Sequence, residues 1–575
     1  MPGPAASSTN TGIARWLPGI AQLRDYPSGA LRGDALAGIS VCVVMIPSVL
    51  AYAELAGVAP QAGLYAALGA MVAYAVFASS RRLIVGPDTT IALLAGSVIV
   101  PLAAGDPARA AELAAMLALL TGALLIVAGR FGLGNVADLL STPVLVGYAN
   151  GAALILVGTQ LPVLLGIPLP RSAFVYRVYD AILALPHAHT TTLSLGIALI
   201  ALILLVAHFA PRAPAALLAC VAAIGASWAL GLPARGVTHL APLAATFPAP
   251  ALPHVALADL QSLAPGALAL ALLVFAEGVL LARALAAKNR EAVEADGELK
   301  ALGAANLAAG VVGGFPVGAS TSRSVTAEAN GAQTQLAQWV AAALLVAFVL
   351  FLAPALDALP RVALSAILVA AGVRLFDAHG LATLYALDRR AFALAIAVTL
   401  GVLLLGVLPG VLLGVALSLA QVLVEVARPR DALLRRLPTD RRFHDLADDE
   451  GGSATPGVLV YRLYAPLIFA NARHVADRLR ALASGAHPPL SCVVLDLQAV
   501  THFDVTALAA LRDLYDEFEG RGIDVRFARA NRPLREQMTR WLGDTRLGTE
   551  RFFPSASAAV DEYIATHKPN PAIKA

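Results

Sequence analysis

Charged residues are scarce in this sequence, and their scarcity decides the broad class of the protein. Only 14% of the 575 residues are Asp, Glu, Lys or Arg, whereas 58% are hydrophobic and the mean hydropathy is +0.74. This composition is typical of a polytopic membrane protein and excludes an ordinary soluble globule. The formal net charge is only +3, and the basic residues form no patch interleaved with aromatic residues. We therefore expect the lipid bilayer as a partner and no nucleic acid.

Cysteine is also rare, and so are the patterns that carry catalysis. The three cysteines, Cys42, Cys220 and Cys492, are an odd number without metal-ligand spacing, so they are interpreted as small core residues. The C-terminal part has no phosphate-binding loop, nucleophile elbow or metal-ligand cluster. We therefore expect no catalytic residues, no metal and no cofactor, and the protein is not predicted to be an enzyme.

Long apolar runs fill most of the chain instead. A polar segment, residues 1–32, has no apolar core and predicts no cleavable export signal, so the first run should remain as a membrane helix. Runs of span length then recur with short breaks up to residue 428. Fourteen segments are predicted: 33–53, 58–78, 87–103, 112–129, 141–165, 192–209, 214–231, 263–286, 299–313, 321–332, 336–356, 361–376, 391–407 and 409–427.

Segments 87–103 and 321–332 are shorter than the roughly 20 residues needed to cross a bilayer. They are third and tenth, the same place in two sets of seven, and each follows a piece marked by glycine and proline, 83–87 and 313–317. This pattern indicates a transporter with an inverted repeat. The predicted fold is therefore an α-helical membrane domain over 33–428, with repeats of seven plus seven segments at about 33–231 and 263–427. Because seven is odd, the second repeat is inverted, and the two half-helices should meet with their N-termini at the midplane.

The tenth segment begins with hydroxyl residues and one arginine. Ser320, Thr321 and Ser322 are of the types that occur at helix starts, where the first backbone N–H groups lack partners. Each helix start carries about half a positive charge, and Arg323 adds one more. An ionisable residue at this depth is costly and indicates a functional site. The natural ligand of such a place is an anion.

Beyond residue 428 the composition changes. Residues 429–456, rich in charge and proline, are interpreted as a linker. Strands are then predicted at 458–463, 492–497 and 524–527, and helices at 471–483 and 506–519. This alternation predicts a small α/β domain over 457–570 that regulates or assembles the protein. Basic residues concentrated in alternate short loops place the N-terminus and this domain in the cytoplasm.

Three separated motifs resemble the SulP anion transporter family. They are the first span with its continuation, residues 37–65, the segment 80–88 that begins Ser80-Arg81-Arg82 and ends Gly86-Pro87-Asp88, and the pair Ser322-Arg323. The resemblance covers roughly residues 20–565. It implies a membrane domain of fourteen segments joined to a C-terminal STAS domain, a homodimer in the cell (inner) membrane, and secondary active transport of a small anion by alternating access.

The resemblance also implies which residues form the site. In such transporters the anion lies between the third and tenth half-helices and contacts the first span. Carried onto this sequence, the anion-binding residues are Ser48, Tyr52, Thr89, Thr321, Ser322 and Arg323. Pro47, Gly86, Pro87 and Asp88 are expected to be structural, and Asp88 is assigned capping alone because a carboxylate beside the anion would repel it. Ser48 departs from the glutamine common at its place, so the identity of the anion does not carry across.

Glu277, deep in the eighth span, matches a family position where a carboxylate faces the site. A lone glutamate in lipid is costly, so it is expected to be protonated, paired with Arg323, or both. One hypothesis is that Glu277 carries the coupling ion, and the alternative is that it only neutralises Arg323. Leu281 stands where sodium-coupled bicarbonate members have a hydroxyl residue, and the loss of this oxygen ligand favours H+ over Na+.

The substrate remains open among small anions. Sulfate ranks first on its frequency in the family, and bicarbonate or a C4-dicarboxylate such as succinate or fumarate follows. The alternatives are a sodium-coupled bicarbonate transporter and an uncoupled anion channel or exchanger. A nucleobase transporter on the same scaffold is disfavoured by Arg323, because such sites place acidic ligands for a neutral base.

Overall fold

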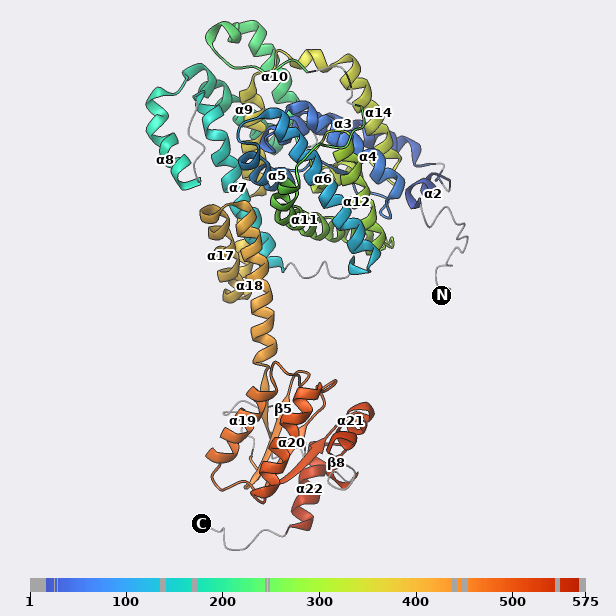
Figure 1. The fold of residues 1–575 in the computed structure, drawn as a ribbon, viewed down its shortest axis with the longest axis vertical. Helices are drawn as coiled ribbons and strands as arrows, with labels where there is room; N and C mark the ends of the chain where they lie inside the picture. Colours follow the sequence, from blue (N-terminus) through green and yellow to red (C-terminus); the bar gives the residue numbers. More distant parts are fainter. Residues whose placement is uncertain are drawn as a thin grey trace. The chain divides into compact units, whose positions relative to one another are not determined.

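The computed structural model describes residues 17–567 except for 25, 28, 135–140, 168–173, 212, 244–245, 247–248, 437–441, 446–452 and 543–548. Most of the predicted N-terminal segment, residues 1–16, and much of the predicted linker therefore lie outside the described residues. The chain divides after Ser418 into two compact units (Figure 1). Each unit is described by itself.

The first unit is helical, and each of the fourteen predicted spans coincides with one helix. The helices of the first repeat are α3 (Leu31–Leu55), α4 (Pro60–Phe77), α5 (Thr89–Ala103), α6 (Pro107–Arg130), α7 (Thr142–Leu165), α9 (Thr190–Phe209) and α10 (Ala215–Leu230). Those of the second are α11 (Leu257–Asn289), α12 (Ala295–Val311), α13 (Thr321–Ala329), α14 (Leu336–Phe351), α15 (Arg361–Leu375), α17 (Arg389–Leu405) and α18 (Val407–Ala427), whose last residues belong to the second unit. Among the described residues, eight helices are long and apolar enough to cross a membrane.

Among the described residues of the first unit, three further α-helices were not predicted. They are α2 (Pro18–Arg24), α8 (Phe174–Ala184) and α16 (Ala378–Leu387). With 7, 11 and 10 residues they are too short to span, so a search for long apolar runs passes over them. Helix α8 exposes large apolar and aromatic side chains, among them Val175, Tyr176 and Tyr179. A helix of this kind suits the interface of a bilayer.

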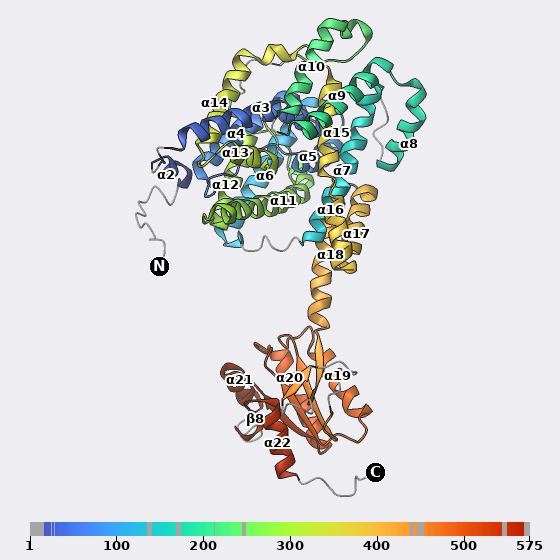
Figure 2. The same cartoon turned by 180° about the vertical axis from the view of Figure 1, so that it is seen from behind.

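The helices of the first unit form two bundles, and the division respects the repeat. The first four helices of each repeat, α3–α6 and α11–α14, pack mainly on one another. The second bundle contains α7, α9 and α10 from the first repeat and α15 and α17 from the second (Figure 2). Helix α18 joins the second bundle through Gly410 and Gly414, where a Cβ would stand 2.5 Å from Val402 and 2.8 Å from Val144. The ion pair of Glu54 in α3 with Arg361 in α15, at 3.0 Å, links the two bundles.

Two short strands interrupt the helices of the first bundle. Strand β1 (Val85–Gly86) pairs antiparallel with β2 (Gly318–Ala319), with Val85 opposite Ala319 and Gly86 opposite Gly318. We call this pair the ribbon. Helices α5 and α13 start directly after β1 and β2, so the antiparallel pairing sends them away from the ribbon in opposite directions. The prediction of two broken helices that meet at their N-termini is confirmed.

Buried amide side chains complete the hydrogen bonds of the ribbon. Asn306 in α12 accepts from the Val317 N–H at 3.0 Å and donates to the Val317 carbonyl at 2.9 Å. Gln338 in α14 accepts from the Val85 N–H at 3.1 Å. Both side chains are fully buried. A non-helical backbone inside a membrane requires such partners, because no water is there to replace them.

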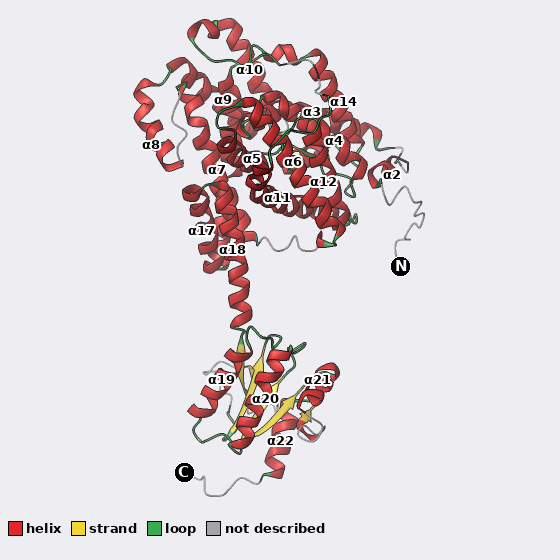
Figure 3. Cartoon of the chain, in the orientation of Figure 1, coloured by secondary structure: helices red, strands yellow, loops and turns green. Residues whose placement is uncertain are grey.

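The second unit is an α/β domain around a six-stranded sheet of order β4-β3-β5-β6-β7-β8 (Figure 3). Its strands are β3 (Asp431–Arg436), β4 (Phe443–Asp445), β5 (Val458–Leu463), β6 (Cys492–Asp496), β7 (Asp524–Ala528) and β8 (Phe552–Phe553). Strands β5 to β8 are parallel, and β3 and β4 are antiparallel. The helices are α19 (Ala472–Gly485), α20 (Val505–Gly520), α21 (Arg532–Leu542) and α22 (Ala556–Thr566). The three strands and two helices predicted from residue 458 onward are confirmed to within two residues.

The interpretation of 429–456 as a linker is wrong in part, because β3 and β4 lie within it. Leu433 pairs with Tyr461 and Leu434 packs in the core, so this segment extends the sheet. The segment was interpreted as a linker because it is rich in proline and charge, and because strand β3 has only one fully buried position among its six residues.

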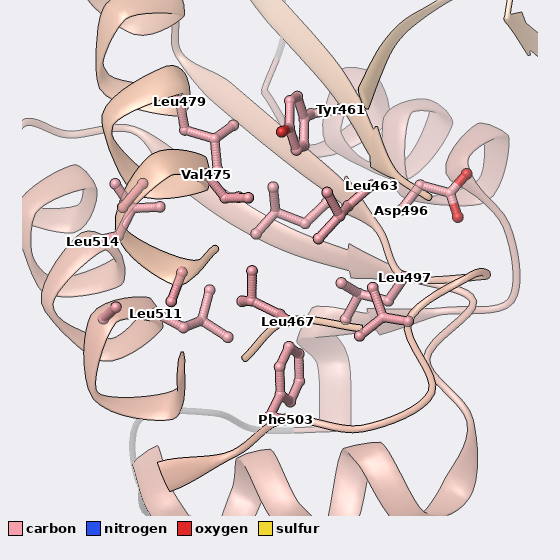
Figure 4. A pocket seen from close by; sticks show the side chains of 15 residues that line it. Tyr461, Leu463, Leu467, Val475, Leu479, Asp496, Leu497, Phe503, Leu511 and Leu514 are labelled. Atoms are coloured by element: carbon pink, nitrogen blue, oxygen red, sulfur yellow. The ribbon is translucent and has the colours of Figure 1, made fainter. Parts of the chain in front are cut away.

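A small apolar cavity lies in this unit between the sheet and helices α19 and α20 (Figure 4). Its lining includes Leu463, Leu467 and Val475, and Asp496 stands at its edge. The buried Asp496 carboxylate binds Arg462 at 2.9 Å and also binds Arg529. Burial raises the pKa of the Cys492 thiol in β6 to about 12, so this cysteine is an inert core residue.

The ribbon's dependence on Asn306 gives a test of the fold. The Asn306→Ala variant leaves the Val317 N–H and carbonyl buried without a partner, which costs roughly 2–4 kcal/mol of stability. We expect a lower midpoint of thermal unfolding in detergent. The control is Asn330→Ala, since the exposed Asn330 side chain bonds only within its own helix, and it should cost less than about 0.5 kcal/mol. Equal midpoints for the two variants would contradict the assigned role.

Candidate anion-binding site

The starts of α5 and α13 face the ribbon. Their N-cap residues are Asp88 and Ser320, and the Ser320 side chain accepts no hydrogen bond from the amides of its helix. Asp88 lies within hydrogen-bonding range of the Thr90 backbone amide and of the Ser320 hydroxyl, so its capping role stays a prediction. The first turns point the positive ends of two helix dipoles toward one place.

Arg323, in the first turn of α13, is buried there with only 2% of its surface exposed. It donates from Nη2 to the Pro87 carbonyl at 2.7 Å, just before α5 begins. Gly86 permits this approach, because a Cβ there would stand 3.4 Å from Nη2. The Arg323 Nε is buried without a hydrogen-bond partner. A buried donor of this kind is rare and leaves one place for an acceptor that comes from outside the chain.

Helix α3 supplies a third side of the site. The Tyr52 hydroxyl hydrogen-bonds to the side chains of Thr89 and Ser48, and it lies within electrostatic range of Asp88 and Arg323. Ser48 also donates to the Val44 carbonyl at 3.1 Å, just after Pro47 interrupts the amide ladder of this helix. The structure thus brings together Ser48, Tyr52, Thr89 and Arg323 from three helices.

Thr321 and Ser322 lie on the other side of the first turn of α13. Both are exposed, whereas Arg323 and Ser324 are buried. Among the described residues, no side-chain hydrogen bond joins either hydroxyl group to Tyr52 or Arg323. The Ser324 hydroxyl accepts from the Ile84 N–H at 2.9 Å and helps to hold β1.

Glu277 approaches the site from α11, but its partner differs from the predicted one. The Thr90 hydroxyl lies 3.3 and 3.2 Å from the two Glu277 carboxyl oxygens. It also lies 3.4 Å from Asp88 Oδ1. No ion pair joins Glu277 to Arg323 in the described part of the chain. Of the two expected alternatives, protonation and pairing with Arg323, the structure therefore does not show the pairing, because the guanidinium donates to the Pro87 carbonyl while Glu277 faces Thr90, the second residue of α5.

Two residues at the site were missed. They are Thr90, buried with 5% exposed, and Tyr148 in α7, whose hydroxyl donates to the Thr90 carbonyl at 3.1 Å. Tyr148 belongs to the second bundle, so this bond connects the two bundles at the start of α5. The position of Thr90 next to Thr89, at the start of a half-helix, is the sequence signal that could have identified Thr90. Tyr148 is a single tyrosine in an apolar span, and nothing in the sequence marks it as a site residue.

Comparison with known proteins identifies the family. The model of the Sulfate permease family matches residues 31–398, and that of the STAS domain matches 453–548. A protein of Mycobacterium tuberculosis (strain CDC 1551 / Oshkosh) named "Probable sulfate transporter" is 38% identical over 550 residues, which cover 96% of this chain and 98% of that protein. An Arabidopsis thaliana protein named "Probable sulfate transporter 4.2" is 30% identical over 92% of this chain and 80% of its own length.

Solved structures agree on the fold. The murine Solute Carrier 26 family member A9 anion transporter matches with a TM-score of 0.89 at 20% identity, over 98% of this chain and 96% of its own. The transmembrane domain of a cyanobacterial bicarbonate transporter matches with a TM-score of 0.60 at 23% identity, over 68% of this chain and 98% of its own. The chain therefore belongs to the sulfate permease (SulP) family, a family of multi-pass membrane transporters of anions rather than enzymes, and it ends in a STAS domain.

Proposed function

We propose that the protein is a secondary active transporter of small anions, with sulfate as the favoured substrate and protons as the driving ion. The observation that carries the proposal is the buried Arg323, whose Nε lacks a partner where the two half-helices α5 and α13 begin. We place the transporter in the cell (inner) membrane, with the N-terminus and the STAS domain in the cytoplasm, on the distribution of basic residues in its loops.

The charges at this place favour an anion. Each helix start contributes about half a positive charge and Arg323 contributes one. Arg323 and the first-turn amides of α5 and α13 bind the anion, and Tyr52, Ser48 and Thr89 line the side that α3 closes. Thr321 and Ser322 contribute through their first-turn amides, because their side chains are exposed. Sulfate is favoured over bicarbonate and a C4-dicarboxylate because the two relatives at 38% and 30% identity carry the name sulfate transporter.

Glu277 takes up the proton that travels with the anion. The residue one turn later is Leu281, which offers no oxygen to a sodium ion, so a proton is favoured. Transport by alternating access then moves one bundle against the other. The Tyr148–Thr90 hydrogen bond and the Glu54–Arg361 ion pair both cross between the bundles, so both contacts change during this movement.

The first prediction concerns Arg323. The Arg323→Ala variant removes the full positive charge of the site, and the loss of charged hydrogen bonds should weaken sulfate binding by roughly 100-fold. The measurement is uptake of labelled sulfate into proteoliposomes as a function of concentration. Arg130→Ala is the matched control, because Arg130 is exposed at the end of α6. Unchanged concentration dependence in Arg323→Ala would exclude this site.

The second prediction concerns Glu277. Uptake should decrease as the pH rises in the wild type, because each anion needs a proton, and the Glu277→Gln variant should lose this dependence near neutral pH. Proton and sodium gradients are imposed separately, and only the proton gradient should drive sulfate uphill. Glu112→Gln, at an exposed position of α6, is the control. A wild-type pH profile in Glu277→Gln would refute the coupling role, and uptake that never runs uphill would favour an uncoupled channel.

A further inference from the structure

The Thr90 hydroxyl stands between two carboxyl groups. It is within 3.4 Å of Asp88 Oδ1 and within 3.3 and 3.2 Å of the two Glu277 oxygens. The Asp88 and Glu277 side chains are also close enough to interact electrostatically. Thr90 is buried, and Asp88 and Glu277 are half-buried residues. The two acids are therefore one hydroxyl group apart.

This arrangement restricts the number of protons present. A threonine hydroxyl has a single hydrogen to donate and can accept through its oxygen. If both acids were ionised, one of them would face the Thr90 oxygen with no hydrogen between, and two like charges would lie close together in a poorly hydrated site. With one proton added, one carboxyl group donates to Thr90 and Thr90 donates to the other. Every contact is then a hydrogen bond.

We infer that Asp88 and Glu277 share one proton through Thr90, and that the position of this proton decides whether Arg323 can bind an anion. The inference rests on the proposed anion site and adds to it a second carboxyl group and a proton path. A transfer breaks the Glu277 O–H bond, forms a new O–H bond on Thr90, and passes the original Thr90 hydrogen to Asp88. The charge moves from Asp88 to Glu277, and no proton is gained or lost.

The charged groups around Thr90 explain why the proton transfer between Glu277 and Asp88 would affect anion binding. Asp88 acts electrostatically on Arg323 and Glu277 is not among the groups that do, although neither carboxylate forms an ion pair with Arg323 among the described residues. The other elements packed here present neutral hydroxyl groups: Ser320 before α13, which hydrogen-bonds to Asp88, Tyr52 from α3 and Tyr148 from α7. An ionised Asp88 therefore occupies Arg323 as an internal competitor of the anion. A protonated Asp88 releases it, and the unpartnered Nε of Arg323 marks the place where the anion then binds.

The two carboxyl variants should have opposite effects on sulfate affinity. In the wild type, the apparent sulfate affinity should fall by up to about tenfold for each pH unit above the pH at which the shared proton is released. Asp88→Asn removes the competitor, so affinity should stay high and change less than about twofold over the same range. In Glu277→Gln, Asp88 loses its like-charged neighbour and stays ionised beside Arg323, so affinity at neutral pH should fall about tenfold or more.

Variants at Thr90 test the path itself. Thr90→Val keeps the shape and removes the hydroxyl, so the pH dependence should change, whereas Thr90→Ser keeps the hydroxyl and should behave as the wild type. The matched control is Thr121→Val in α6, where a buried threonine bonds only to the Leu117 carbonyl of its own helix. Infrared spectra of the purified variants report protonated carboxyl groups independently of transport. A protonated-carboxyl band present in the wild type should shift in Thr90→Val, stay in place in Thr121→Val, and disappear in the Asp88→Asn/Glu277→Gln double variant.

The outcomes separate this inference from the proposed function. If Glu277→Gln alone abolishes the pH dependence while Asp88→Asn and Thr90→Val match the wild type, Glu277 acts by itself and the shared proton is refuted. If the wild type shows no proton-driven sulfate uptake, the proposed function fails. The infrared band then still decides the shared proton: an identical band in Thr90→Val and Thr121→Val, or a band that survives the double variant, overturns it.

Discussion

The antiparallel pairing of Val85–Gly86 with Gly318–Ala319 is the interaction on which the rest of the structure depends. It joins the two halves of the chain at the point where both helices are broken. It also brings the N-termini of α5 and α13 together, so that two helix dipoles act on one place. Without this pairing, the two starts would have no fixed relation, and Arg323 could not reach the Pro87 carbonyl. The electrostatics of the site is therefore a consequence of backbone topology.

The site combines this fixed field with groups that can change their charge. The helix ends and Arg323 are permanently positive, whereas Asp88 and Glu277 are titratable. Helices α5 and α13 hold the permanent part, and α11 brings Glu277. Tyr148 is a contact from the second bundle, and it bonds to a backbone carbonyl rather than to an ionisable group. All these charges therefore belong to the first bundle, and the proposed movement of one bundle against the other would leave them together.

Much of the membrane fold could be predicted from the sequence, because lipid requires long apolar runs and because glycine and proline mark the two breaks. The partner of Glu277 could not. Its position in the eighth span shows that a carboxylate is buried, but an apolar helix gives no signal of its rotation about its axis, and so Thr90 rather than Arg323 faces it. Strand β3 was hidden for a different reason. It lies at the antiparallel side of its sheet, where one fully buried position suffices and charged residues are tolerated.

The hydrogen bonds of the ribbon also bear on how the two repeats have diverged. Among the described residues, the side chains that bond to the backbone at 84–85 and 317 are Ser324, Gln338 and Asn306, which all come from the second half of the chain. The first half supplies Ser80, whose hydroxyl accepts from the Leu83 N–H just before the ribbon. Two copies of the first half would therefore lack the amide side chains that bond to the backbone at 85 and 317.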